Sequence, residues 1–123
     1  KESLNLGVEK ACHGNRLGDI SSAVQQHVEN NGFSIVREFV GHGIGTQLHE
    51  DPQIPNFGTA DQGPLLQEGM VLAIEPMVNQ GSNAVKILPD QWTAVTADKM
   101  FSAHFEHMVA VTKKGPEILT SMN

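Results

Sequence analysis

The sequence is poor in the residues on which several classes of protein depend. Its 123 residues include one cysteine and no tyrosine, and only 5% of them are aromatic. Cys12 alone cannot close an intrachain disulfide, which excludes a disulfide-stapled scaffold and favours a reducing compartment. The longest apolar run, Met70–Ile74, is far shorter than the roughly 20 residues that span a bilayer. With no visible signal peptide, we expect a cytoplasmic protein without membrane contact.

Positive charge is also scarce. Eight lysines and arginines stand against fourteen acidic residues, which gives a formal net charge of −6. A chain of this sign repels a phosphate backbone, so we expect no direct binding of nucleic acid. Hydrophobic residues make up 39% of the chain, which is enough to build one core. The length fits one domain, without room for a second.

The order of the sequence patterns predicts an α+β fold. Two helices are expected first, over residues 1–12 and from Asp19 as N-cap to about residue 31. Strands are expected at 33–40, 70–78, 86–88, 91–96, 102–112 and 117–120. Gly41–Gly45 is predicted to be a tight loop, and residues 51–64, with three prolines, an irregular segment. Helices followed by hairpin-connected strands indicate a curved, mainly antiparallel sheet.

Two glutamates interrupt the most apolar of these strands. Glu75 lies within MVLAIEPMV, and Glu106 lies within SAHFEHMVAVT. A buried carboxylate is costly unless it is paired, protonated or bound to a metal. A salt bridge is the structural alternative, but the surrounding strands offer few cations. Both glutamates are therefore candidate metal ligands.

The neighbours of the two glutamates support this interpretation. Pro76 keeps Glu75 extended and is expected to end the regular strand ladder beside it. On the later strand, alternation puts His104 and Glu106 on one face and His107 on the other. Only one side chain of the Glu106–His107 pair can therefore face a given site, and a carboxylate suits a hard divalent ion better.

Two histidines flank a glycine-rich turn. His42 stands between two glycines, which leave its imidazole accessible, and His49 follows seven residues later. A lone histidine is more often a polar structural residue than a ligand. Together with Glu75 and Glu106, however, His42 would form a mixed nitrogen and oxygen site for Mn, Fe, Co or Zn.

The motifs resemble those of the type I methionine aminopeptidases, which are metallopeptidases of the pita-bread fold. The blocks that carry the resemblance are GHGIG (41–45), LHEDP (48–52), AIEPMV (73–78), WTAVTADKMFSA (92–103) and FEHMVAVT (105–112). Their order and spacing match, and the likeness runs to about Thr120. HGxG with a later EP also occurs in the related X-Pro peptidases, but SAHFEHMVAVT favours the methionine enzyme.

The resemblance implies removal of the N-terminal methionine from nascent polypeptides by a two-metal centre. His42 and Glu75 would bind one metal ion, and Glu106 would bridge both. His49 would hydrogen-bond the scissile peptide and stabilise the oxyanion, and Glu75 would also handle the proton of the attacking water. Trp92 and Leu48 would line the methionine pocket. The family usually has Phe in place of Leu48, and the alternative for Trp92 is plain core packing.

The resemblance covers only the C-terminal half of such an enzyme. Two aspartate ligands and a second substrate-contacting histidine belong to the family's N-terminal half, and nothing in residues 1–123 matches them. We therefore expect half of a pita-bread fold, at most one bound metal ion and little turnover by this chain alone. The absent half should leave apolar surface open to self-association or to a complementary chain. Two alternatives stay open: half of an X-Pro peptidase, and a non-catalytic module that binds peptides.

Overall fold

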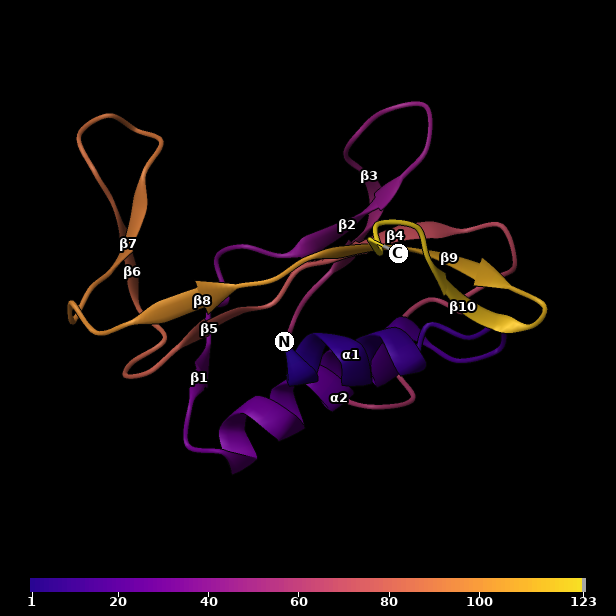
Figure 1. Cartoon of the computed structure of the whole chain (residues 1–123), viewed down its shortest axis with the longest axis horizontal. Helices are drawn as coiled ribbons and strands as arrows, with labels where there is room; N and C mark the ends of the chain where they lie inside the picture. The colour runs from indigo at the N-terminus through magenta and orange to yellow at the C-terminus, as the bar shows by residue number, and fades with distance from the viewer. Residues whose placement is uncertain (123) are drawn as a thin grey trace.

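Two helices pack against one face of a layer of short antiparallel strands. The computed structural model describes residues 1–122, and Figure 1 shows helices α1 (Glu2–Glu9) and α2 (Leu17–Asn30) side by side beneath the strands. The strands are β1 (Ser34–Ile35), β2 (Gly41–Ile44), β3 (Glu50–Ile54), β4 (Val71–Ile74), β5 (Met77–Asn79), β6 (Val85–Ile87), β7 (Ala94–Thr96), β8 (Ser102–His104), β9 (His107–Thr112) and β10 (Gly115–Ile118). The predicted α+β class is confirmed.

The strands form three antiparallel sheets. The five-stranded sheet has the order β10-β9-β4-β2-β3, and the three-stranded sheet has the order β1-β5-β8. The third sheet is the β6–β7 hairpin, which projects from the rest of the molecule in Figure 1. Because β4 pairs with β9 while β5 pairs with β8, the same two chain segments run from one sheet into the next.

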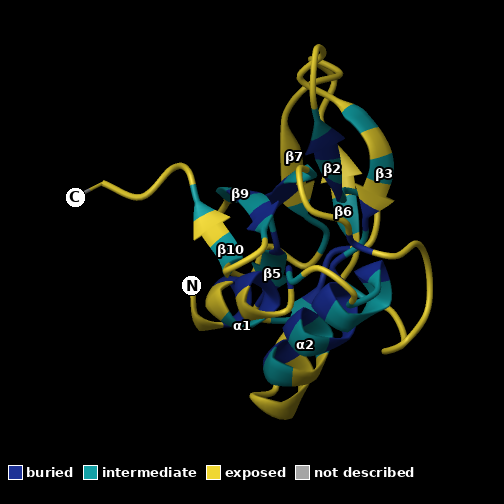
Figure 2. Ribbon diagram, turned by 90° about the vertical axis from the view of Figure 1, so that its right-hand side faces the viewer, coloured by how far each residue is buried: buried dark blue, intermediate teal, exposed yellow. Residues whose placement is uncertain are grey.

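The core lies between the helices and the five-stranded sheet. The predicted stripe of α2 is buried, with Ile20 and Val24 fully enclosed and Val28 nearly so. Leu4 and Val8 of α1 share one buried cluster with Ile20, while Val24 and Val28 form a second cluster with Ile35 of β1. Figure 2 shows the buried parts of the helices in dark blue where they meet the strands. The helices cross closely at Gly7, where a β-carbon would press against Val24. The hydrophobic spacing therefore predicted the packing faces of both helices correctly.

The start of α2 differs from the prediction in one respect. Arg16, not Asp19, is the N-cap, and Asp19 occupies the third helical position. Its carboxylate accepts hydrogen bonds from the backbone N–H groups of Arg16 and Asp61, both at 2.8 Å. These bonds, that to Arg16 first, hold the pKa of Asp19 below its ordinary value. Asp19 thus ties the helix start to the loop at Asp61.

Replacing Asp19 with alanine is expected to lower the free energy of unfolding by about 1 kcal/mol at neutral pH, because it removes the carboxylate that accepts the N–H of the N-cap residue. Because the folded-state pKa is depressed, the stabilisation is present above the unfolded pKa and is lost as pH falls through the folded one. The gap between wild type and Asp19→Ala, measured by urea unfolding, should therefore close at acid pH. Asp61→Asn, which keeps the backbone donor, is the control and should cost little; a gap independent of pH would contradict the assignment.

The predicted loop at Gly41–Gly45 is wrong, because Gly41–Ile44 is strand β2. It pairs with β3 on one side and β4 on the other, with a bulge between His42 and Gly43. A β-carbon on Gly41 would collide with the carbonyl of Ala73, and one on Gly43 with the carbonyl of Asp51. The glycines are there because neighbouring backbones approach too closely for side chains. A composition typical of loops here marks a tightly packed central strand.

The other strand predictions need different boundaries. The strand expected at 86–88 is β6 at Val85–Ile87, that expected at 91–96 is shortened to β7, and that expected at 117–120 is β10 at Gly115–Ile118. The expected strand at 33–40 is reduced to β1, which has only the three residues of β5 to pair with. The irregular segment predicted at 51–64 begins with β3 and becomes irregular only after Ile54. The strands expected at 70–78 and 102–112 are each interrupted, and the interruptions contain Glu75 and Glu106. Pro76 cannot donate a ladder hydrogen bond, which ends β4 as predicted.

Candidate metal centre

Three predicted ligands from distant parts of the sequence converge at the interruption of the strands. His42 comes from β2, Glu75 follows the last residue of β4, and Glu106 immediately precedes β9. The ladders align them, since His42 is opposite Ala73 and Ile74 is opposite His107. One ligand atom from each of the three side chains lies within 4.8 Å of the other two. Among residues 1–122, this is the group whose geometry could hold a metal ion.

Local backbone contacts orient His42. Its Nδ1 lies 3.0 Å from the carbonyl oxygen of Gly43, and because a carbonyl can only accept, Nδ1 carries the proton and donates it. In the neutral ring, Nε2 then keeps a free lone pair, and it lies 3.4 Å from Oε1 of Glu75. Metal-binding histidines are commonly oriented in this way by a carbonyl on the other nitrogen.

Glu75 is a largely buried carboxylate whose pKa is raised. Its side chain is 14% exposed, and within residues 1–122 its ion-pairing partners are His42 and His104, with no lysine or arginine in reach. Burial first, and the nearby charge of Glu106 second, raise the pKa of Glu75, while His42 and His104 oppose the rise. The salt bridge to a lysine or arginine, the structural alternative for this residue, is therefore not found there.

The donor set fits a divalent cation. Two carboxylates and the lone pair of an imidazole face one another at a partly buried position, so negative charge accumulates without a fixed positive group. Such a cluster needs a proton or a cation to offset the repulsion. Mixed imidazole and carboxylate ligands suit Mn, Fe, Co or Zn, and the exposure of Glu106 leaves the group accessible from solvent.

Of the remaining predicted site residues, the structure brings His49 to this group but does not bring Leu48 or Trp92 into the cavity beside it. His49 stacks at an angle of 41° on His42, with ring centroids 4.0 Å apart. Leu48, in the β2–β3 connection, and Trp92, between β6 and β7, are 66% and 88% exposed. Trp92 is therefore not packed in the core of this chain. His42 and His49 share a cavity of about 420 Å³ whose lining includes neither Leu48 nor Trp92.

Carboxylate hydrogen bonds also shape the β2–β3 connection that carries Leu48 and His49. Glu50 accepts from the backbone N–H of Gln47 and the hydroxyl of Thr46, each at 3.0 Å. These bonds, led by that to Gln47, lower the pKa of Glu50. Glu50 is therefore a structural carboxylate that holds the loop rather than a fourth ligand.

One neighbour of the site was not identified as a site residue from the sequence. Nε2 of His104 lies 3.3 Å from Oε2 of Glu75, the carboxylate oxygen that does not face His42. The strand alternation that placed His104 on the face of Glu106 was the available signal. It gave no reason to connect His104 with Glu75, because that contact depends on the pairing of β8 with β5.

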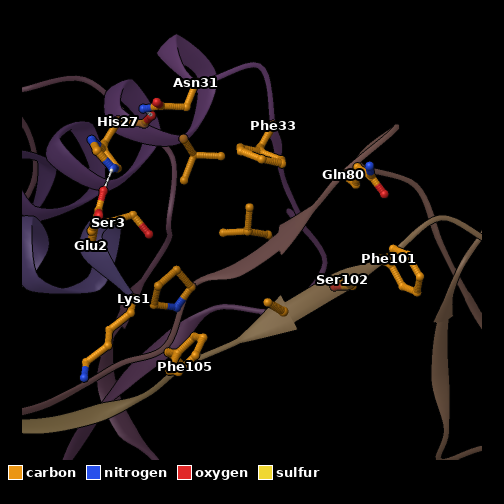
Figure 3. A pocket seen from close by; sticks show the side chains of 14 residues that line it. Lys1, Glu2, Ser3, His27, Asn31, Phe33, Gln80, Phe101, Ser102 and Phe105 are labelled. Atoms are coloured by element: carbon orange, nitrogen blue, oxygen red, sulfur yellow. Dashed lines mark hydrogen bonds and ion pairs between the residues drawn. The ribbon is translucent and has the colours of Figure 1, made fainter.

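A larger groove is lined by Pro76 and Phe105, the sequence neighbours of Glu75 and Glu106, but by none of the candidate ligands themselves. It has a volume of about 530 Å³ and runs between the two helices and strands β5 and β8. Figure 3 shows Phe33 and Phe105 among the side chains along it, with the pair of Glu2 and His27 at the helix side. Its lining is mostly apolar and contains none of the three candidate ligands. We therefore interpret this groove as a packing surface and not as the reaction site.

Comparison with known proteins agrees with the geometry. The sequence profile of metallopeptidase family M24 matches residues 1–113. The chain belongs to this family. Membership in M24 implies the use of a divalent metal, consistent with the grouping of His42, Glu75 and Glu106.

Among M24 proteins, the chain is similar to bacterial methionine aminopeptidases. It is 62% identical to methionine aminopeptidase from Clostridium perfringens and 58% identical to methionine aminopeptidase 1 from Bacillus subtilis, in each case over 98% of this chain and 48% of the relative. It also matches the crystal structure of methionine aminopeptidase from Thermotoga maritima with a TM-score of 0.96 and 50% identity, over 98% of this chain and 49% of that one. The chain thus spans about half the length of the curated relatives it matches, and the predicted half-fold is confirmed.

More distant M24 structures share the fold alone. Prolidase from Pyrococcus horikoshii matches with a TM-score of 0.69 and 24% identity, over 99% of this chain and 29% of that one. The higher sequence identity to the methionine aminopeptidases than to the prolidase favours the methionine enzyme over the X-Pro peptidases. Within residues 1–122, no helix is long and apolar enough to cross a membrane.

Proposed function

We propose that this chain is the C-terminal half of a methionine aminopeptidase, and that its activity is removal of N-terminal methionine from nascent polypeptides. The observation that carries the proposal is the convergence of His42, Glu75 and Glu106 within 4.8 Å in a chain 62% identical to such an enzyme. A cytoplasmic location, suggested by the single cysteine, belongs to the same proposal.

In the proposed site His42, Glu75 and Glu106 would hold a metal ion of the set Co, Mn, Fe and Zn, and Glu106 would serve both ions of a complete site. Bound divalent ions would supply Lewis-acid activation of water near neutral pH and would stabilise negative charge on the peptide oxygen. Glu75 would take up the proton of the attacking water, and His49, stacked on His42, would donate a hydrogen bond to the scissile peptide oxygen. The missing aspartate ligands leave this chain with one ion at most.

Leu48 and Trp92 form two walls of the proposed methionine pocket. Both side chains are largely exposed, which suits residues whose remaining neighbours come from a complementary polypeptide. An apolar pocket of this kind discriminates methionine from side chains one methylene shorter by only about 1–3 kcal/mol. Leu48 gives a pocket shape different from that made by the phenylalanine usual in the family.

We infer that a complementary half packs along the groove of about 530 Å³ and the neighbouring edge of β8. Strand β8 pairs only with β5 among the described strands, and all three of its residues are exposed. Phe101 beside it is 84% exposed, and Phe105 is 47% exposed. Without a partner, such a surface favours self-association. Light scattering of the chain alone is expected to reveal oligomers, and a clean monomer would contradict this inference.

The test is methionine release from a Met-Ala-type peptide with added Mn²⁺ or Co²⁺. The chain is assayed alone and mixed with the half of the Clostridium perfringens relative that it does not match. We expect little release by the chain alone and clear release by the mixture, lost with Glu106→Ala. No release by the mixture, with the intact relative active in parallel, would contradict the proposal.

The same assay separates the two alternatives. Half of an X-Pro peptidase would cleave peptides that have proline as the second residue, whatever the first residue is. This alternative is tested because the prolidases share the fold. A non-catalytic peptide-binding module would bind Met-Ala-type peptides after chelation of the metal and after His42→Ala. We expect neither result.

A further inference from the structure

His104 lies beside the metal ligands without belonging to their group. Its Nε2 is 3.3 Å from Oε2 of Glu75, whereas the three side chains with ligand atoms mutually within 4.8 Å are His42, Glu75 and Glu106. The β5–β8 ladder fixes its place, because His104 is opposite Met77, two residues beyond Glu75. The contact between His104 and Glu75 thus lies at the interruption between the β4–β9 ladder and the β5–β8 ladder.

The two oxygens of Glu75 have different partners. Oε1 lies 3.4 Å from Nε2 of His42, and Oε2 lies 3.3 Å from Nε2 of His104. A glutamate side chain has three rotatable bonds, so a ligand carboxylate needs contacts that select one orientation. Within residues 1–122, the two histidines are the side chains that pair with it. Since His42 belongs to the ligand group, His104 is the side chain outside that group which can hold the carboxylate of Glu75 in one orientation.

We propose that His104 is a positioning residue that holds Oε2 of Glu75 and thereby presents Oε1 to the ion shared with His42 and Glu106. This inference rests on the proposed function. Losing a residue that orients a metal ligand commonly reduces metal affinity by about 10- to 100-fold. His104 needs only an N–H donor at this distance, so a glutamine, which carries a side-chain amide, can replace it.

The test is Co²⁺ binding by the 123-residue chain, followed by its visible absorption and by calorimetric titration. The variants are His104→Leu, which removes the donor, and His104→Gln, which keeps one. His107→Gln is the matched control, because His107 pairs with Thr120 and not with the site. We expect His104→Leu to weaken Co²⁺ binding at least tenfold and to alter the absorption band. We expect His104→Gln and His107→Gln to bind like the unmodified chain.

Thermal unfolding of the metal-free proteins separates positioning from a structural role. Because His104 contacts the partly buried Glu75, we expect His104→Leu to unfold slightly below the unmodified chain without metal and to gain less stability when Co²⁺ is added. Equal Co²⁺ affinity of His104→Leu and the unmodified chain would overturn the inference, as would an equal loss of affinity in His104→Gln or a gain of stability from Co²⁺ as large as that of the unmodified chain. Failure of the unmodified chain to bind Co²⁺ would instead overturn the proposed metal centre, and the inference with it.

Discussion

Replacing Glu106 with glutamine is expected to reduce Co²⁺ affinity by at least about 100-fold, more than the loss of an orienting neighbour. Glutamine keeps the size of the side chain but removes one of the two negative charges in the group of His42, Glu75 and Glu106. Calorimetric titration measures the loss. The control is Glu117→Gln, which removes the same charge from an exposed position on β10 and should leave the affinity unchanged.

The metal-free protein gives a second readout for Glu106→Gln. The charge of Glu106 helps to raise the pKa of Glu75, so removing it relieves a repulsion between the exposed Glu106 and the partly buried Glu75. The unfolding midpoint without metal is therefore expected to stay level or to rise. A large fall in that midpoint would show that Glu106 has a structural role, and unchanged Co²⁺ affinity would exclude it as a ligand.

Replacing Leu72 with alanine is expected to lower the free energy of unfolding by about 2–5 kcal/mol, the usual cost of a cavity left by a buried leucine. Leu72 is fully buried on β4, between its ladder partners Gly43 and Val109. The control is Ile87→Ala on β6, where the side chain is 54% exposed and little burial is lost. Urea unfolding measures both, and equal midpoint shifts would contradict the assigned core.

The helices could be predicted well because their signal is local. Helical spacing of Ile20, Val24 and Val28 identifies a buried face whatever covers it, and all three are buried. The helix start was misplaced by a few residues because aspartate suits both the N-cap and the third helical position. Only the contacts of Asp19 with the N–H groups of Arg16 and Asp61 distinguish the two.

The strands were harder because their boundaries depend on partners distant in sequence. Gly41 and Gly43 have a composition typical of turns, yet they lie in a strand because the carbonyls of Ala73 and Asp51 leave no room for a β-carbon. That crowding arises only once three strands are assembled. The break after Ile74 was predictable, since Pro76 marks it in the sequence.

The ligand group could be proposed from chemistry before its geometry was known. Glu75 and Glu106 were selected because charged residues are out of place in apolar strands, and the fold brings both to His42. The roles of Leu48, His49 and Trp92 came from family resemblance and remain predictions. His104 was overlooked because the importance of a histidine at a strand end depends on what lies opposite, which the sequence does not state.

The passage of two chain segments from one sheet to another has a mechanical consequence. Ladder pairing between them stops after Ile74 and His107 and resumes at Met77 and His104, and the two carboxylates occupy this unpaired stretch. One backbone hydrogen bond, from the N–H of Phe105 to the carbonyl of Pro76 at 3.4 Å, crosses the interruption. A cation bound by both carboxylates would join the two chain segments at this point. Metal binding would then hold the two sheets at a fixed angle, and a change of that angle would weaken the binding.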